Sequence, residues 1–304
     1  LLHHANIVDV LELGQEQDRW FLAMEFVDGP TLAEILALCR ERKALLPRFA
    51  VVDLGLQICR GLHHAHEFQD SSGQPLSLIH RDLKPSNLIV DRSGIAKVCD
   101  FGIAKAASNL HNTTTSGMVK GTPRYMSPEQ IAGERDLDRR SDLFSFGVIL
   151  FELITGRTLY DAGSLPALIH QIAYEDTTPR LDPAEAAFPG SQAVLERLLN
   201  RDRDARYPDA MALSDDLREL GRAYPAAAEM SEVIRRVMPA LDRTGSTEIG
   251  STGDLGLGHS EPDVDEEGTE LAPISDFTPI PAPAPTSGGW ERFSEVFDAS
   301  SGTA

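Results

Sequence analysis

The stretch LIHRDLKPSNLIV, residues 78–90, places Asp82, Lys84 and Asn87 on a short loop between two apolar runs. A carboxylate can orient an attacking hydroxyl, and an ammonium can offset the charge of a moving phosphoryl group. An amide oxygen can ligate Mg²⁺ or Mn²⁺, and Asp100 offers a second oxygen ligand after a short strand. Because phosphoryl transfer needs positioning and charge neutralisation more than covalent chemistry, the pattern predicts that reaction.

Short strands and longer helices are expected to position these side chains. Thr31 is suited to cap a helix that runs through Arg40. Apolar spacing predicts further helices near 48–68, 140–155, 165–174, 192–200 and 209–220. Apolar runs predict strands at 6–13 and 20–26, joined by a polar turn at 14–18, and at 88–90 and 96–99. Few strands first and many helices later indicate an α+β fold.

Four motifs together resemble those of eukaryotic-type (Hanks-type) serine/threonine protein kinases. HisArgAspLeuLysProSerAsn (80–87) and AspPheGly (100–102) resemble the catalytic loop and the metal-binding triplet. GlyThrProArgTyrMetSerProGlu (121–129) resembles the substrate-binding segment, and AspLeuPheSerPheGly (142–147) the buried helix beneath the catalytic loop. The resemblance runs from about Ile7 to Leu220 and implies a two-lobed kinase fold. MetSerProGluGln (126–130) is similar to the bacterial branch of the family.

The resemblance assigns catalytic roles to the residues of the loop. It implies that Asp82 is the catalytic carboxylate, that Lys84 stabilises the phosphate of ATP, and that Asn87 and Asp100 hold the metal. A lysine two residues after the aspartate implies Ser or Thr acceptors on protein substrates. Thr122 is then expected to close the acceptor site.

The resemblance also implies an adenine site and a structural frame. Met24 is expected at the gatekeeper position of a hinge, with the backbones of Glu25 and Val27 on the adenine edge and Ile89 beneath its ring. Asp100 borders the same nucleotide site. The frame residues are expected to be Asp142, under the catalytic loop, and Glu129 with Arg206, as a buried ion pair.

Thr113, Thr114, Thr115 and Ser116 lie where the family carries activating phosphorylation. Arg81, next to the catalytic aspartate, is the residue that anchors a phosphothreonine in the family. New charge-assisted hydrogen bonds can order such a loop, so autophosphorylation within 113–116 is expected. The alternative is an ordinary polar loop.

Three upper-lobe features of an active kinase are absent from the 304 residues: the glycine-rich loop, the strand lysine and its partner glutamate. LeuHisHisAlaAsnIleVal (2–8) resembles the segment that follows that glutamate's helix. A truncated active kinase is therefore one expectation, and a catalytically inactive scaffold is the other. In both cases the 304 residues alone are expected to bind ATP weakly and transfer little phosphate. Small-molecule phosphotransferases are set aside because they generally lack the 121–129 platform.

Composition limits partners and compartment. The formal net charge is −19, from 47 acidic and 28 basic residues, which argues against nucleic-acid binding. Cys39, Cys59 and Cys99 lack metal or disulfide spacing and indicate a reducing, cytoplasmic setting. The longest apolar stretch, 143–156, is too short to span a bilayer, so no membrane span is expected in this chain. A membrane-anchored parent protein remains open.

Three segments follow from these patterns. The kinase domain is expected over 1–224, an extra helix over 225–242, and a disordered acidic Pro/Ser/Thr/Gly-rich tail over 243–304. Within the tail, Trp290, Phe293 and Phe297 fall on one face of a helix. The short aromatic motif 290–297 can dock a partner protein, dock the kinase itself, or begin a further domain.

Two other features have a functional and a structural interpretation. His63, His64 and His66 form either a metal cluster or a helix end with one packed and two solvated histidines. Cys99, directly before AspPheGly, is either a redox switch or a small buried hydrophobic residue.

Overall fold

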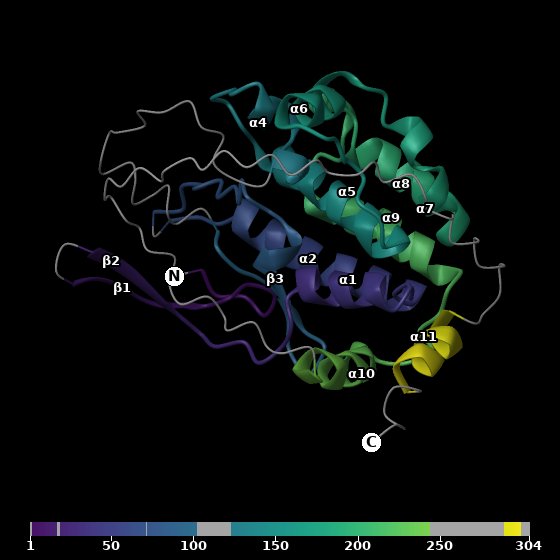
Figure 1. Ribbon diagram of the computed structural model, residues 1–304. Helices are drawn as coiled ribbons and strands as arrows, with labels where there is room; N and C mark the ends of the chain where they lie inside the picture. The colour runs from purple at the N-terminus through teal and green to yellow at the C-terminus, as the bar shows by residue number, and fades with distance from the viewer. Residues whose placement is uncertain (1, 17–18, 71, 102–122, 244–288, 299–304) are drawn as a thin grey trace, which may run out of the picture.

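The computed structural model describes residues 2–16, 19–70, 72–101, 123–243 and 289–298. Within these ranges the chain forms two small antiparallel sheets and a larger helical body, as Figure 1 shows. This arrangement confirms the α+β class expected from the sequence.

The first sheet pairs β1 (Val10–Glu16) with β2 (Arg19–Met24), which extends from the helical body (Figure 1). The predicted polar turn at 14–18 is wrong in its bounds, because Gly14 pairs with Phe21 and Glu16 with Arg19. Leu11 and Leu13 are 64% and 54% exposed, so this part of the strand packs little of its surface. A polar sequence can therefore continue the ladder without burying a polar side chain.

The second sheet is a tight hairpin of β3 (Leu88–Val90) and β4 (Ala96–Val98). Its turn is closed by Asp91, whose Oδ1 accepts hydrogen bonds from the backbone of Ser93 (2.8 Å) and Ile95 (2.9 Å). Gly94 has a φ of +87°, which suits glycine in such a turn. Leu88 and Val90 face the core while Ile89 between them is half-buried, as expected for alternating strand residues.

Two helices connect the sheets to the body. Thr31 caps α1 (Leu32–Glu41) as predicted, and the side chain of Glu34 closes a reciprocal capping box with it. α2 (Arg48–His66) ends two residues earlier than predicted, because Glu67 and Phe68 turn back to bond the carbonyls of His63 and Ala65. α2 packs along α9 on one side and against β4 on another.

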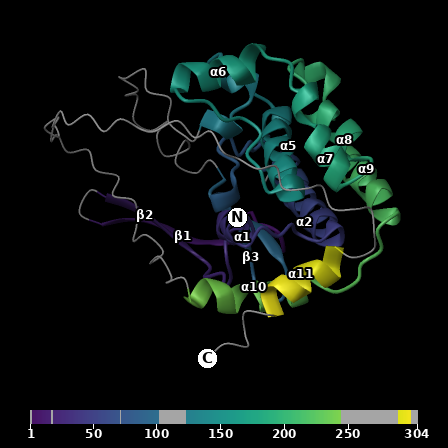
Figure 2. The same cartoon turned by 45° about the vertical axis from the view of Figure 1, so that its right-hand side comes forward.

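α5 (Arg139–Thr155) is the central helix of the body, and Figure 2 shows it surrounded by other helices. Every residue from Ser141 to Thr155 is buried, so the helix has no solvent face. Asp138 caps its beginning and Gly156, with a φ of +66°, ends it. α5 packs against α2, α7 (Asp182–Ala187) and α8 (Ser191–Leu198), and the helical body also contains α4 (Pro128–Ile131), α6 (Leu165–Tyr174) and α9 (Ala210–Arg222).

Short 3₁₀ turns complete the body at η1 (Pro85–Asn87), η2 (Pro123–Tyr125), η3 (Thr178–Arg180) and η4 (Arg203–Ala205). Two helices, α10 (Met230–Arg243) and α11 (Gly289–Asp298), follow the body in the chain. The described helices include none that is both long and apolar enough to cross a membrane.

Candidate active site

The loop between α2 and β3 brings Asp82 and Lys84 together. Lys84 Nζ lies 2.8 Å from Asp82 Oδ2, and the two side chains are 24% and 47% exposed. Asn87 Nδ2 donates to the backbone carbonyl of Asp82 at 2.9 Å, which fixes the turn of the loop. A carboxylate and an ammonium therefore lie side by side at an accessible edge of a rigid loop.

Asp100 is placed beside this loop by the hairpin. The backbone N–H of Cys99 donates to the carbonyl of Asn87 at 3.0 Å, so Asp100 follows directly next to Asn87. The Asn87 side-chain nitrogen donates its hydrogen bond to the carbonyl of Asp82. The amide oxygen is therefore the group that can ligate a cation. Asp100 is exposed. Two hard oxygen donors on adjacent backbone segments fit Mg²⁺ or Mn²⁺.

Asp142 of α5 holds the backbone of the loop from below. It is fully buried and accepts hydrogen bonds from the backbone of His80 and Arg81, both 2.9 Å, and from His66 Nε2 at 2.8 Å. Arg81 has a φ of +68°, a strained value for a side chain of its size, which these bonds stabilise. Burial alone would raise the pKa of Asp142, but the His66 hydrogen bond, nearby positive charge and the Arg81 N–H hold it below its ordinary value.

The role of His80 was missed by sequence reasoning, although the residue lies in the quoted motif. His80 Nε2 lies 2.7 Å from the carbonyl oxygen of Cys99, and its ring packs 4.9 Å from that of Phe101. The side chain is 1% exposed. His80 thus joins the catalytic loop to the strand end that carries Asp100.

We expect Asp142→Asn to lower the free energy of unfolding, since the amide presents a nitrogen where three donors converge. A buried donor without an acceptor costs about 1–3 kcal/mol. The wild-type carboxylate has a lowered pKa, so its contribution is complete above about pH 4, the ordinary range of Asp, and is lost as the pH falls below it. Urea unfolding of both proteins at pH 7 and near pH 3.5 tests this. A stability difference that stays constant or grows toward acid contradicts it.

Glu129 and Arg206 form a buried pair beside the start of α5. Arg206 donates to the two carboxylate oxygens of Glu129 at 2.7 and 2.9 Å, and Ser141 Oγ adds a third hydrogen bond at 2.7 Å. The side chains of Arg206 and Glu129 are 0% and 5% exposed. Burial would raise the pKa of Glu129, but the hydrogen bonds and charge of Arg206 hold it low.

Three further contacts, which the sequence did not point to, position the segment after Thr122. Gln130 Nε2 donates to the carbonyl of Arg81 at 2.7 Å and so ties α4 to the catalytic loop. The hydroxyl of Tyr125 donates to Glu152 at 3.1 Å, and the hydroxyl of Ser145 donates to the Tyr125 carbonyl at 2.7 Å. Thr122 itself lies outside the described residues.

The predicted hinge runs beside β3. Val90 N–H donates to the carbonyl of Pro30 at 2.8 Å, and Gly29 comes so close that a β-carbon there would lie 1.9 Å from the Val90 oxygen. The backbone N–H of Glu25 donates to the carbonyl of Asp9 at 2.9 Å. Among the described residues, nothing hydrogen-bonds the carbonyl of Glu25 or the backbone of Val27. These groups stay available to a ligand.

The other two residues expected at the adenine site, Met24 and Ile89, lie in different strands, β2 and β3. Met24, the last residue of β2, is 38% exposed. Ile89 forms an isolated bridge with Thr31, just after the hinge. Partial exposure of both side chains is compatible with a flat apolar ligand between them.

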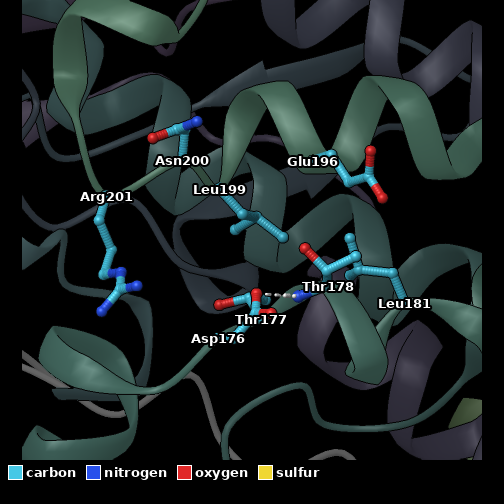
Figure 3. A pocket seen from close by; sticks show the side chains of 8 residues that line it. All are labelled: Asp176, Thr177, Thr178, Leu181, Glu196, Leu199, Asn200 and Arg201. Atoms are coloured by element: carbon cyan, nitrogen blue, oxygen red, sulfur yellow. Dashed lines mark hydrogen bonds between the residues drawn. The ribbon is translucent and has the colours of Figure 1, made fainter.

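Two cavities among the described residues are not lined by Asp82, Lys84, Asn87 or Asp100. One, of about 250 Å³, is lined by hinge residues Glu25–Asp28 with Asp91, Arg92, Ser93 and Lys97, and it does not include Ile89 or Asp100. The other, of about 140 Å³, lies between α8 and the segment before α7 (Figure 3). Its lining is Asp176, Thr177, Thr178, Leu181, Glu196, Leu199, Asn200 and Arg201, which include none of the predicted catalytic, metal or adenine residues. Neither cavity is assigned to catalysis.

Several expected features lie outside the described residues: Thr113, Thr114, Thr115, Ser116 and the region around them. Arg81, the expected anchor of a phosphate there, is described. Its guanidinium has no hydrogen-bond or ion-pair partner within the described part of the chain.

The alternative interpretations of the histidines and Cys99 are not supported. Among the described residues no group of three or more His, Cys, Asp or Glu is arranged to hold a metal ion. His66 is packed as expected, whereas His63 and His64 are half-buried and not fully solvated, and the ring of His64 stacks on that of His4. Burial, and then the charge of Asp100, raise the pKa of Cys99 to about 12, which disfavours thiolate chemistry.

Residues 1–217 match the family model of the protein kinase domain. The chain belongs to the protein kinase family. The kinase fold expected from the four motifs is therefore confirmed. The matched region covers both sheets, the catalytic loop and the helical body into α9, while α10 and α11 follow it.

Three relatives similar to this kinase come from bacteria. It is 37% identical to the tyrosine-protein kinase MasK of Myxococcus xanthus over 71% of this chain and 33% of that protein. It is 30% identical to the serine/threonine-protein kinase PksC of Streptomyces coelicolor, over 93% and 48%. The serine/threonine-protein kinase PknB of Mycolicibacterium smegmatis is 32% identical, over 81% and 39%. This kinase thus belongs to the bacterial branch of the eukaryotic type, and it spans a third to a half of these relatives' lengths.

Proposed function

We propose that this kinase transfers the γ-phosphoryl group of ATP to Ser or Thr hydroxyls of proteins. The observation that carries the proposal is the arrangement of Asp82 and Lys84 at an accessible edge, with Asn87 and Asp100 on adjoining backbone. The buried side chains of Asp142 and His80, which hold the loop backbone and the Cys99 carbonyl, support a loop kept in a fixed shape for catalysis. Family membership supports the same function.

Each residue then has one task in the reaction. Asp82 accepts the proton of the substrate hydroxyl as its oxygen attacks the γ-phosphorus. The bond between that phosphorus and the bridging oxygen breaks, ADP leaves, and Lys84 offsets the negative charge that develops on the moving group. Asn87 and Asp100 are the ligands for Mg²⁺ or Mn²⁺, which supplies charge neutralisation on the ATP phosphates when bound.

For the nucleotide, we propose that the hinge carries the adenine. The free Glu25 carbonyl would accept from the adenine amine, and the Val27 backbone would meet the ring nitrogen edge. Met24 and Ile89, both partly exposed, would contact the ring. At the acceptor site, Thr122 would hydrogen-bond near Asp82 and Lys84 when a protein substrate is bound.

Regulation by phosphorylation within Thr113–Ser116 is part of the proposal. Arg81 supports it, because its guanidinium has no partner among the described residues and its backbone is held by Asp142 and Gln130. A phosphate on the 113–116 segment would supply two or three charge-assisted acceptors for that guanidinium. The partners of the kinase are then proteins with Ser or Thr acceptors.

The acceptor residue could in principle be Ser, Thr or Tyr, since the relative MasK is named a tyrosine-protein kinase. Lys84 sits two residues after Asp82, close enough for a 2.8 Å contact with its carboxylate. In the family that the motifs resemble, a lysine two residues after the catalytic aspartate accompanies Ser or Thr acceptors, and this pattern supports Ser or Thr over Tyr.

The test compares the 304-residue chain with a longer chain that adds any residues encoded in frame upstream of Leu1. Each is incubated with labelled ATP, Mg²⁺ or Mn²⁺ and a general protein substrate, and the product is hydrolysed for phosphoamino-acid analysis. Phosphoserine or phosphothreonine from either chain supports the proposal. Phosphotyrosine alone would replace it with tyrosine transfer. No transfer from either chain, with no ATP binding, would favour the catalytically inactive scaffold.

A further inference from the structure

α11 lies beyond the family match, yet its aromatic face is packed. Phe293 and Phe297 are 1% and 4% exposed, and Trp290 is half-buried. These three residues lie on one face of the helix, at i, i+3 and i+7. An isolated ten-residue helix is marginal in water, so contacts with the body must stabilise it.

Three elements of the kinase supply those contacts. The ring of Phe49, at the start of α2, meets Trp290 edge-on at 5.6 Å. Arg236 of α10 lies 4.6 Å from the Trp290 ring, and Arg42, at the end of α1, lies 5.0 Å from the ring of Phe297. We call the surface formed by Arg42, Phe49 and Arg236 the docking groove. Guanidinium groups over aromatic rings are favourable contacts.

The direction of α11 in the docking groove is also determined. Arg42 Nη1 donates to the carbonyl of Val296 at 3.4 Å, in the last turn of α11. A cation at this end complements the partial negative charge of a helix C-terminus. Glu291 lies in the first turn, where a carboxylate is favoured. A reversed helix would lose the interaction with Arg42.

α10 connects the docking groove to the hairpin of β3 and β4. Both views place α10 and α11 side by side, on the side of α1 and β3 away from α6 (Figures 1 and 2). A β-carbon on Gly94 would lie 2.6 Å from the backbone nitrogen of Ser231, so α10 begins against the turn between β3 and β4. β3 follows Asn87 directly, and β4 ends one residue before Cys99. α10 therefore supports the hairpin that carries the two metal-ligand candidates.

We propose that the docking groove binds an amphipathic helix with aromatic residues at i, i+3 and i+7, and that residues 289–298 of the same chain occupy it. Occupancy holds α10 against the β3–β4 turn and so stiffens the hairpin between Asn87 and Asp100. Residues 244–288 have an extended length of more than about 100 Å, which allows the helix to reach the groove of its own chain without strain. The proposal does not depend on the reaction that the kinase performs.

Amide hydrogen exchange on the whole 304-residue chain tests it. The double variant Phe293→Ala/Phe297→Ala removes the buried rings and raises helix propensity, while Glu295→Ala, on the exposed face, is the matched control. In the double variant we expect exchange within 289–298 to rise at least about tenfold, with a smaller rise in 230–243 and 91–95 and none in α5. The control should match the wild type.

Three results would overturn the inference. Wild-type exchange in 289–298 at the rate of an unfolded peptide would show that the groove is not occupied. An exchange rate in residues 91–95 that is the same in the wild type and the double variant would show that α11 is not coupled to the β3–β4 hairpin. Protection that grows with protein concentration, together with a dimeric mass by light scattering, would assign the helix to the groove of a second copy.

Discussion

Asp82→Asn is expected to lower kcat for phosphoryl transfer to a protein about 10²- to 10⁴-fold, the usual contribution of a positioned general base. The amide keeps an oxygen for the hydrogen bond with Lys84, which lies 2.8 Å from the carboxylate, but it cannot accept the substrate proton. KM for ATP should change little, because the Asn87 and Asp100 side chains are untouched. Initial rates with labelled ATP, in the preparation that transfers phosphate, measure both constants.

The matched control is Asp215→Asn. Asp215 is an exposed aspartate of α9 that pairs with the neighbouring Arg218 at 2.6 Å, and its substitution should leave kcat unchanged. Thermal unfolding of Asp82→Asn should match the wild type, since the Asp82 side chain is 47% exposed. If Asp82→Asn kept more than about a tenth of wild-type kcat, Asp82 would not be the base.

Arg206→Met is expected to lower the free energy of unfolding by about 3–5 kcal/mol, because it leaves the buried Glu129 carboxylate without its cation. Three backbone carbonyls that accept from Arg206 also lose their donor, those of Asn200, Arg140 and Arg201. For a domain of this size the loss corresponds to a fall in Tm of roughly 6–20 °C. Urea unfolding at pH 7 measures it.

Lowering the pH should reduce the loss of stability caused by Arg206→Met. Glu129 has a lowered pKa in the wild type, so the pair contributes fully above the ordinary range of Glu, about pH 4.3, and its contribution is lost as the pH falls below it. Without Arg206 the carboxyl can take up a proton and remain buried as a neutral group. The wild-type and variant stabilities should therefore converge toward acid.

A double-mutant cycle separates the pair from its surroundings. Glu129→Met/Arg206→Met should be more stable than Arg206→Met alone, since no charge then remains buried. Arg218→Met removes an exposed pair partner and should change stability by no more than about 0.5 kcal/mol. Additive losses in the cycle would show that Glu129 and Arg206 act separately.

The sequence by itself identified the family of this protein and grouped its candidate catalytic residues. Asp82, Lys84 and Asn87 lie within six residues of one another, so their closeness along the chain could be read from the sequence. The Thr31 cap, α5 and the β3–β4 hairpin were also predictable, because caps, apolar runs and turn residues act over a few positions. Errors occurred at element ends, such as 14–18 and 67–68, where pairing or a local hydrogen bond decided the boundary.

Only the tertiary structure decided how the loop is held and where the tail helix lies. Asp142 meets His66 and the loop backbone across more than 60 positions of chain, and His80 meets Cys99 across 19, contacts that no local pattern encodes. The aromatic face of Trp290, Phe293 and Phe297 was visible in the sequence, but its partner was not. Hydrophobic burial has no direction, so periodicity can predict that a face will be covered, while only the assembled α1, α2 and α10 show what covers it.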